Sequence, residues 1–225
     1  MISPLFLLLI GAPLLLGLYA QMKVSGAFGK YKRIPAMSGL TGARVAREIL
    51  RMARINDVEV VEINDMLGDH YDPLKKRLCL STEVYHTPSI AALGIAAHEA
   101  GHAIQHSRAY GPLKLRMSIV PVTQISSQIL PFVILGGFAF QIAGLITVGI
   151  VCYAVLTLFQ LITLPVEFDA SRRAKIILQE MGIVRAPEEI KGVSSVLNAA
   201  ALTYVAAFVA ALGNLSYLFL TRREN

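Results

Sequence analysis

The sequence predicts a mostly α-helical integral membrane protein with about four transmembrane helices and a small α/β domain. Two observations predict this fold class. Of the 225 residues, 55% are hydrophobic, and the mean hydropathy of +0.58 exceeds what a soluble domain usually shows. Three stretches, residues 2–21, 119–166 and 193–220, contain no Asp, Glu, Lys or Arg.

The lengths of these stretches predict the number of spans. A helix needs about 20 apolar residues to cross the hydrocarbon core of a bilayer, so 2–21 and 193–220 fit one span each and 119–166 fits two. The first stretch lacks a positively charged start, so we expect a retained span rather than a cleaved signal peptide. Asn198 and Asn214 interrupt the Ala-rich last stretch, where a partly buried helix is the alternative.

The motif His98-Glu99-Ala100-Gly101-His102 predicts a zinc site. Residues four apart lie on one face of a helix, so His98 and His102 can bind one metal ion. Glu99 lies beside the first ligand, where its carboxylate can accept a proton from attacking water. The helix around the motif, which Pro88 and Ser89 are expected to start, is almost wholly apolar. A buried Glu between two buried His needs a cation, so we predict one Zn2+ per chain and a zincin-like catalytic domain.

A third protein ligand is expected, because catalytic zinc sites commonly use three and leave the fourth position open. The next acidic residue after Glu99 is Glu167, directly beyond the uncharged run 119–166. Two spans in this run return Glu167 to the side of the membrane that holds His102, whereas one span would separate them. The glycines at 136–137 and at 144–149 are both candidate places for the turn between the two spans.

These expectations divide the chain into five segments. They are a first transmembrane helix (1–21), an α/β segment with the HExxH helix (22–118), a two-span hairpin (119–166), a third-ligand helix with its connector (167–192), and a last transmembrane helix (193–221).

Charge predicts the orientation of the α/β segment. Between Met22 and Ser118 the chain has 14 Lys and Arg against 9 Asp and Glu, and the positive-inside rule places such a segment in the cytoplasm. We therefore expect a multi-pass protein of the cell membrane with a cytoplasmic catalytic face. The net charge of +6 fits topology and lipid headgroups, and no aromatic and basic pattern indicates nucleic acid.

The α/β segment has recognisable elements. Thr41 is expected to cap a helix through about Arg54, with Val45, Ile49 and Met52 on its apolar side. Residues 58–63 and 77–85 are expected to form strands. The second strand directly precedes the zinc helix, so it is either a platform that pairs with an extended peptide substrate or an ordinary core strand.

A second polar cluster lies upstream of the motif, at Asp69, His70, Tyr71 and Asp72, before Pro73. These residues are candidates to orient a zinc histidine, stabilise an oxyanion or bind a second cation. The alternative is a solvated turn capped by an Asp. His86 and His106 are expected to be surface or structural residues. Of Arg172 and Arg173, one is expected to pair with an acidic residue near the site and the other to face phospholipid.

Four stretches together resemble the YugP family of membrane zinc metallopeptidases. They are Leu93–His106 around the motif, Asp69–Pro73, Gly39–Ala46 and Glu167–Ala174, and the resemblance extends over nearly the whole chain. The combination is far more specific than the zinc motif alone. The resemblance implies the class of enzyme and its metal, and leaves the substrate open.

More distantly, the order of helix, hairpin and Glu is similar to HtpX-type quality-control proteases and CAAX prenyl proteases. In those proteins the third ligand opens a Glu-x-x-Ala-Asp pattern, and this Asp supports a zinc histidine. Glu167 and Ala170 match the pattern, but Ser171 stands where the Asp would be. Asp169 and Asp69 are therefore the candidates for that supporting role.

The expected function is a membrane-bound, gluzincin-like metalloendopeptidase that hydrolyses protein or peptide substrates at the cytoplasmic face, with Glu99 as general base. Three alternatives stay open: a zinc-binding membrane scaffold or chaperone, a zinc hydrolase of a non-peptide substrate, and an intramembrane protease. A structural site needs no general base, and the apolar run before His98 is too short to cross a bilayer. The lipid bilayer is an expected partner; adaptor proteins and the oligomeric state stay undetermined.

Overall fold

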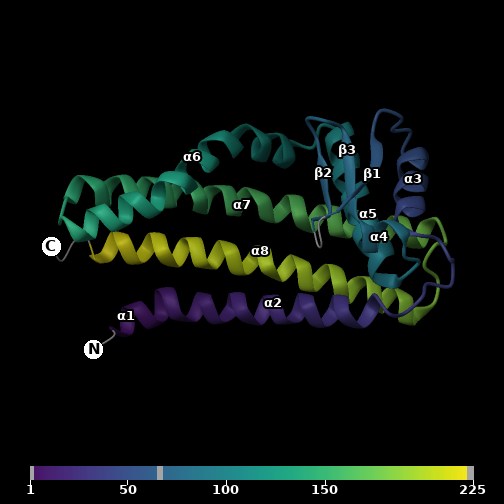
Figure 1. Cartoon of the computed structure of the whole chain (residues 1–225), viewed down its shortest axis with the longest axis horizontal. Helices are drawn as coiled ribbons and strands as arrows, with labels where there is room; N and C mark the ends of the chain where they lie inside the picture. The colour runs from purple at the N-terminus through teal and green to yellow at the C-terminus, as the bar shows by residue number, and fades with distance from the viewer. Residues whose placement is uncertain (1–2, 65–67, 222–225) are drawn as a thin grey trace. The chain divides into compact units, whose positions relative to one another are not determined.

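A computed structural model describes residues 3–64 and 68–221 (Figure 1). Contacts divide the chain into two compact units. Of the described residues, the first unit takes 3–21, 114–165 and 202–221, and the second takes the remainder. The helices are α1 (Pro4–Phe6), a π-helical turn η1 (Leu7–Gly11), α2 (Ala12–Tyr31), α3 (Gly42–Met52), α4 (Thr82–His86), α5 (Ile90–Ser107), α6 (Gly111–Ala139), α7 (Ala143–Glu180) and α8 (Pro187–Thr221).

Four helical stretches are long and apolar enough to cross a membrane: Pro4–Tyr31, Gly111–Ala139, Ala143–Glu180 and Pro187–Thr221. The prediction of four candidate spans is therefore confirmed. The last of them is the most buried: 33% of its most apolar 18-residue stretch is buried within the protein. The mean hydropathy of this stretch, 1.9, still suits a span. Helix α5, which carries the HExxH motif, is not among the candidate spans of the described chain.

The turn between α6 and α7 lies at residues 140–142, outside both glycine groups expected to form it. Gln141 takes the positive φ that closes the turn. The glycines at 136–137 and 144–149 lie within or at the start of the helices instead. At Gly149 an added Cβ would lie 2.8 Å from the end of the Ile134 side chain of α6, which would have to shift.

The second unit contains a three-stranded sheet of β1 (Glu59–Ile63), β2 (His70–Asp72) and β3 (Arg77–Ser81). The order is β1-β3-β2, with β1 parallel and β2 antiparallel to β3. Strand β3 is therefore central, and four of its five residues are buried. Since both of its edges pair with strands of this chain, the interpretation of this segment as a peptide-binding platform is wrong, and it is a core strand.

The strand expected over residues 77–85 is shorter than predicted. It ends at Ser81, and Thr82–His86 form α4. The helical turn puts Val84 into the core with no exposed surface, while the hydroxyl of Tyr85 remains outside and accepts a hydrogen bond from Arg47. The alternation of apolar and polar residues in this segment is too short to distinguish a strand from a helix, and packing selects the helix.

Helices α3 and α5 begin as predicted. The side chains of Thr41 and Ser89 each accept a hydrogen bond from a backbone N–H of the first helical turn. Val45 and Ile49 are fully buried, which confirms the apolar side of α3. Met52 is 48% exposed, so the prediction for this residue is wrong; it is the last residue of the helix.

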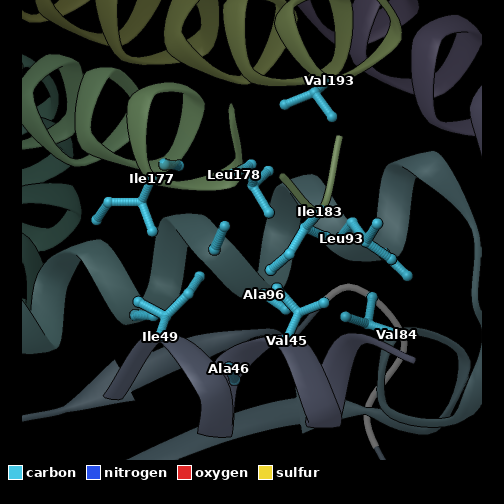
Figure 2. Close-up of a cluster of buried hydrophobic side chains, with 14 of the residues drawn as sticks. Val45, Ala46, Ile49, Val84, Leu93, Ala96, Ile177, Leu178, Ile183 and Val193 are labelled. Carbon is cyan, nitrogen blue, oxygen red and sulfur yellow. The ribbon is translucent and has the colours of Figure 1, made fainter. Parts of the chain in front are cut away.

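The core of the second unit packs α3, the sheet, α4 and α5 against the parts of α7 and α8 that belong to this unit (Figure 2). Figure 2 shows Ile49, Leu93 and Leu178 converging from α3, α5 and α7. Each is at most 1% exposed, and burial of such a side chain contributes roughly 1.5–3 kcal/mol. This core holds α5 beside the part of α7 that belongs to the second unit.

Gly42 is a position where the core tolerates no side chain. An added Cβ would lie 2.3 Å from the backbone oxygen of Val84. We therefore expect Gly42→Ala to destabilise the protein by about 1–3 kcal/mol, because α3 or α4 must move. Thermal unfolding in detergent measures the effect.

Gly111→Ala is the matched control, since no atom lies within 4 Å of its added Cβ. We expect this variant to unfold at the wild-type temperature or slightly above. Equal melting temperatures for Gly42→Ala and wild type would show that the contact between α3 and α4 is not tight.

Candidate metal centre

Helices α5 and α7 bring three possible metal ligands together. Nε2 of His98 lies 3.2 Å from Oε2 of Glu167, and Nε2 of His102 lies 3.5 Å from the same oxygen. One ligand atom from each residue lies within 4.8 Å of those of the other two. The side chain of Glu167 is 2% exposed, and those of the histidines 12% and 10%.

These separations fit a zinc ion. With bond lengths near 2.1 Å, a tetrahedral zinc has ligand atoms about 3.4 Å apart. The donor chemistry fits as well, because two imidazoles and a carboxylate are common zinc ligands. As ligands, neutral His98 and His102 turn nitrogen lone pairs toward the Glu167 carboxylate, and three converging acceptors require a cation between them.

The remaining ring nitrogens of both histidines are also occupied. Nδ1 of His98 lies 3.1 Å from the hydroxyl of Ser171. Nδ1 of His102 lies 3.0 Å from Oε1 of Gln105. Both rings are thus held from behind, and Nε2 is the nitrogen left to face the metal position.

The backbones of the two ligand helices approach closely at Gly101. An added Cβ there would lie 2.9 Å from the backbone oxygen of Ala170. Ala97, Ala100 and Ala170 have no exposed surface. The expectation that small residues around the motif permit close approach to another backbone is confirmed at Gly101.

Glu99 is 8% exposed and lies one position from His98. Burial raises the pKa of its carboxyl above the ordinary value, and the negative charges of Glu167 and Asp69 add to this, while the two histidines oppose it. Glu99 is on the face of α5 that continues through Ala103 and His106, next to the face of the two ligands.

A cleft lies along this face of α5. Its walls come from α5, from Tyr71 on β2, from Lys76 before β3 and from the segment before β1. The lining residues are Ile55, Asp57, Val58, Tyr71, Lys76, Ala103, His106 and Ser107. Tyr71 Oη lies 2.8 Å from Nδ1 of His106, so this histidine is a structural partner of the β2 wall, in agreement with the role expected for it.

The other residues of the upstream cluster make hydrogen bonds away from the ligands. Asp72 accepts from two backbone N–H groups of the turn that follows it, as the capped-turn interpretation expects. His70 is exposed and contacts a backbone carbonyl. Asp69 accepts from the backbone N–H and the hydroxyl of Ser81, so it extends the hydrogen bonding of β3 and does not support a zinc histidine directly.

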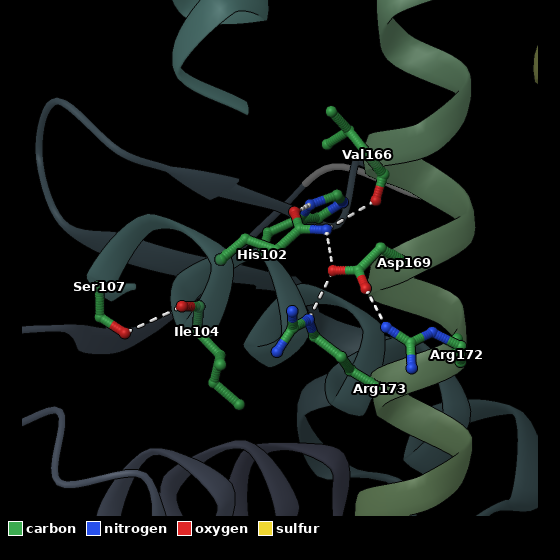
Figure 3. A network of polar contacts seen from close by, with 8 residues as sticks. His102, Ile104, Ser107, Val166, Asp169, Arg172 and Arg173 are labelled. Atoms are coloured by element: carbon green, nitrogen blue, oxygen red, sulfur yellow. Dashed lines mark hydrogen bonds and ion pairs between the residues drawn. The ribbon is translucent and has the colours of Figure 1, made fainter. Parts of the chain in front are cut away.

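Asp169 is the acid nearest to the supporting role (Figure 3). Its carboxylate accepts from Arg172 and Arg173 and from the amide of Gln105, which in turn contacts His102. Both arginines pair with Asp169, which is the expected acidic residue near the site; the expectation that one of them faces phospholipid stays a prediction.

Two contacts of the site were not predicted from the sequence. Gln105 follows His102 by three residues and has no exposed surface, so a polar residue on the ligand face of an apolar helix was the available signal. Ser171 takes the place of the Asp of the distant relatives and contacts His98 itself.

Comparisons with known proteins find similarity to a metallopeptidase family and to a membrane protease. A family model described as "Putative neutral zinc metallopeptidase" matches residues 6–223. The chain is 47% identical over 208 residues to the "Putative membrane protease YugP" of Bacillus subtilis (strain 168), and the alignment covers 92% of each chain. No solved structure matches the chain significantly.

Gly101→Ala tests whether the approach of α5 and α7 sets the metal geometry. The new methyl group must push Ala170 away and carry Glu167, on the same helix, with it. We expect zinc affinity to fall at least tenfold, because metal sites tolerate only about 0.2 Å of error. Competition with a chromophoric chelator measures the affinity.

Gly94→Ala is the control on the same helix, since its added Cβ would make only ordinary contacts at 3.6 Å and beyond. Its zinc affinity should equal that of the wild type. If Gly101→Ala also binds zinc like the wild type, the close approach does not define the site.

Proposed function

The chain belongs to the family of neutral zinc metallopeptidases whose model covers residues 6–223, and on that premise we propose that it is a membrane-bound zinc endopeptidase. Its substrates are proteins or peptides cut at the cytoplasmic face of the cell membrane. The observation that carries the proposal is the convergence of His98, His102 and Glu167 from α5 and α7 beside a buried glutamate.

One zinc ion per chain is proposed, held by Nε2 of His98, Nε2 of His102 and the carboxylate of Glu167. Three protein ligands leave one position open for chemistry, as in catalytic rather than structural sites. When bound there, zinc supplies Lewis acidity that polarises a scissile carbonyl and makes water a nucleophile near neutral pH.

The chain's own residues handle the protons. Glu99 accepts a proton from the water whose oxygen adds to the carbonyl carbon, and returns it to the amine nitrogen as the C–N bond breaks. The hydrolysis then yields one carboxylate and one amine. His98 and His102 remain in place through Ser171 and Gln105, which hold their Nδ1 atoms.

The cleft beside α5 supports a polypeptide as the substrate. It lies on the face of α5 that carries Glu99, and Ala103 and His106 line it one and two turns further along. A chain that presents its scissile bond at Glu99 can therefore place neighbouring residues in the cleft. Because α5 is not a candidate span, we propose cleavage at the membrane surface and not within the bilayer.

The orientation follows from charge and from the hairpin. Residues 22–118 contain 14 basic and 9 acidic residues, and this excess of basic residues supports a cytoplasmic position for α5. Helices α6 and α7, joined at residues 140–142, then return Glu167 to the same side. The proposal requires two crossings between the two parts of the site.

Glu99→Gln tests the general base. We expect zinc to remain bound and turnover to fall 10²–10⁴-fold, because the amide cannot take the proton. Cleavage of a proteome-derived peptide library by detergent-purified protein, followed by mass spectrometry, measures turnover, and metal analysis measures zinc. His98→Ala is the contrasting variant, which should lose zinc as well as activity.

The outcomes separate the alternatives. Full activity in Glu99→Gln would remove the assigned base. A wild-type protein that binds zinc and cleaves no peptide, with or without added metal, would contradict the endopeptidase proposal and favour a scaffold or a non-peptide hydrolase. Unchanged zinc content in His98→Ala would reject the ligand set.

Topology provides an independent prediction. Leu74 and Phe140 are exposed at 87% and 75%, and Glu180 is exposed at the end of α7. In a background without Cys79 and Cys152, an impermeant maleimide added to intact cells should label Phe140→Cys and spare Leu74→Cys and Glu180→Cys. All three should react after permeabilisation.

Labelling of Leu74→Cys and Glu180→Cys from opposite sides would show that the motif helix and the third ligand are separated by the membrane. The proposed zinc centre could then not form.

A further inference from the structure

Gln105 is a buried amide between the two ligand-bearing helices. Its side chain has no exposed surface. Oε1 lies 3.0 Å from Nδ1 of His102, and Nε2 donates to the backbone oxygen of Val166 at 2.8 Å and to Oδ2 of Asp169 at 2.9 Å. One side chain of α5 thus contacts a ligand ring on its own helix and two acceptors on α7.

The far end of this network determines how the amide is turned. Arginine side chains only donate hydrogen bonds. Asp169 accepts hydrogen bonds from Arg172 and Arg173, so both its oxygens are acceptors (Figure 3). The carbonyl of Val166 is an acceptor too. The NH2 group of Gln105 must therefore face α7, because a flipped amide would put oxygen against two oxygens in a buried site.

The orientation of Gln105 determines the tautomer of His102. Since Oε1 of Gln105 can only accept, Nδ1 of His102 must carry the hydrogen. A neutral His102 then has its lone pair on Nε2, the nitrogen that lies 3.5 Å from Glu167. His102 is therefore held in the form that binds a metal through Nε2.

His98 is held differently. Its Nδ1 contacts the hydroxyl of Ser171, which can either donate or accept. This contact positions the ring without selecting a tautomer. The two histidines of the motif, similar in sequence, thus differ in how firmly the protein predetermines their binding nitrogen.

Gln105 also acts on the third ligand. Val166 precedes Glu167 and Asp169 follows it by two residues, so the NH2 group of Gln105 binds α7 on both sides of the glutamate. The same amide that orients the His102 ring therefore fixes the position of the Glu167 backbone relative to it.

We propose that Gln105 is a positioning residue of the zinc site, which selects the Nε2-binding tautomer of His102 and holds Glu167 beside it, with Asp169 and its two arginines fixing the direction of the amide. The inference rests on the proposed zinc ligands but not on peptidase activity.

Zinc affinity of the purified full-length protein tests the proposal, measured by competition with a chromophoric chelator. Gln105→Met keeps the length of the side chain and removes all three hydrogen bonds. We expect zinc affinity to fall about 10–100-fold, as for other residues that support metal ligands from behind. Gln179→Met, the same change at an exposed position of α7, should bind zinc like the wild type.

Asp169→Asn is the sharper variant, because it preserves the shape of the site. An asparagine can place an NH2 group where Asp169 has an acceptor oxygen, so only the Val166 carbonyl still opposes a reversed Gln105 amide; the reversed amide would donate to Nδ1 of His102 and favour the wrong tautomer. We expect a loss of zinc affinity of 10–100-fold here too. The double variant Gln105→Met/Asp169→Asn should lose no more than Gln105→Met alone, because both changes act through the same ring.

The absorption spectrum of the Co2+-substituted protein supplies a second readout of ligand geometry, and it should change in both single variants. If Asp169→Asn shows the zinc affinity and the Co2+ spectrum of the wild type, the proposal is overturned. This outcome can be measured even if Gln105→Met fails to fold. If His98→Ala and His102→Ala bind zinc like the wild type, the ligand set itself fails, which is a separate outcome.

Discussion

The contact between α5 and α7 at Gly101 is the constraint on which the candidate site depends. A backbone oxygen of α7 lies 2.9 Å from the position where any other residue would have its Cβ. On the same two helices, side-chain atoms of His98 and His102 converge on Glu167 within 3.2–3.5 Å. Because metal sites tolerate errors of only a few tenths of an ångström, the packing of the two helices bears directly on the geometry of the candidate site.

The two helices are packed together by a hydrophobic core like that of a soluble protein. Leu93 of α5 and Leu178 of α7 are buried in one cluster with α3 and the central strand. Helices α7 and α8 each continue from an apolar stretch in the first unit into this core. Helix α7, a candidate span over one part of its length, thus supplies a candidate metal ligand and core residues over another.

The polar groups inside this apolar region form chains that end at charges or backbone atoms. One chain of hydrogen bonds runs from His102 through Gln105 to Asp169 and its two arginines. The other joins His98 to Ser171. A buried polar group without a partner costs about 1–3 kcal/mol, so each link stabilises the next. Ser171 stands where the pattern of the distant relatives has an Asp, and its hydroxyl lies 3.1 Å from Nδ1 of His98.

The sequence by itself determined the four apolar helices, the helix caps at Thr41 and Ser89, the motif helix and the family. These properties depend on local composition, spacing and hydrogen bonding within one turn, which the residue order contains. Tertiary structure decided the rest. It ended β3 at Ser81, made that strand central, put the hairpin turn at Gln141, brought Gln105 to Val166 and Asp169, and brought Ser171 to His98. Each of these depends on what packs beside the segment, and residues more than 60 positions apart meet only in the folded chain.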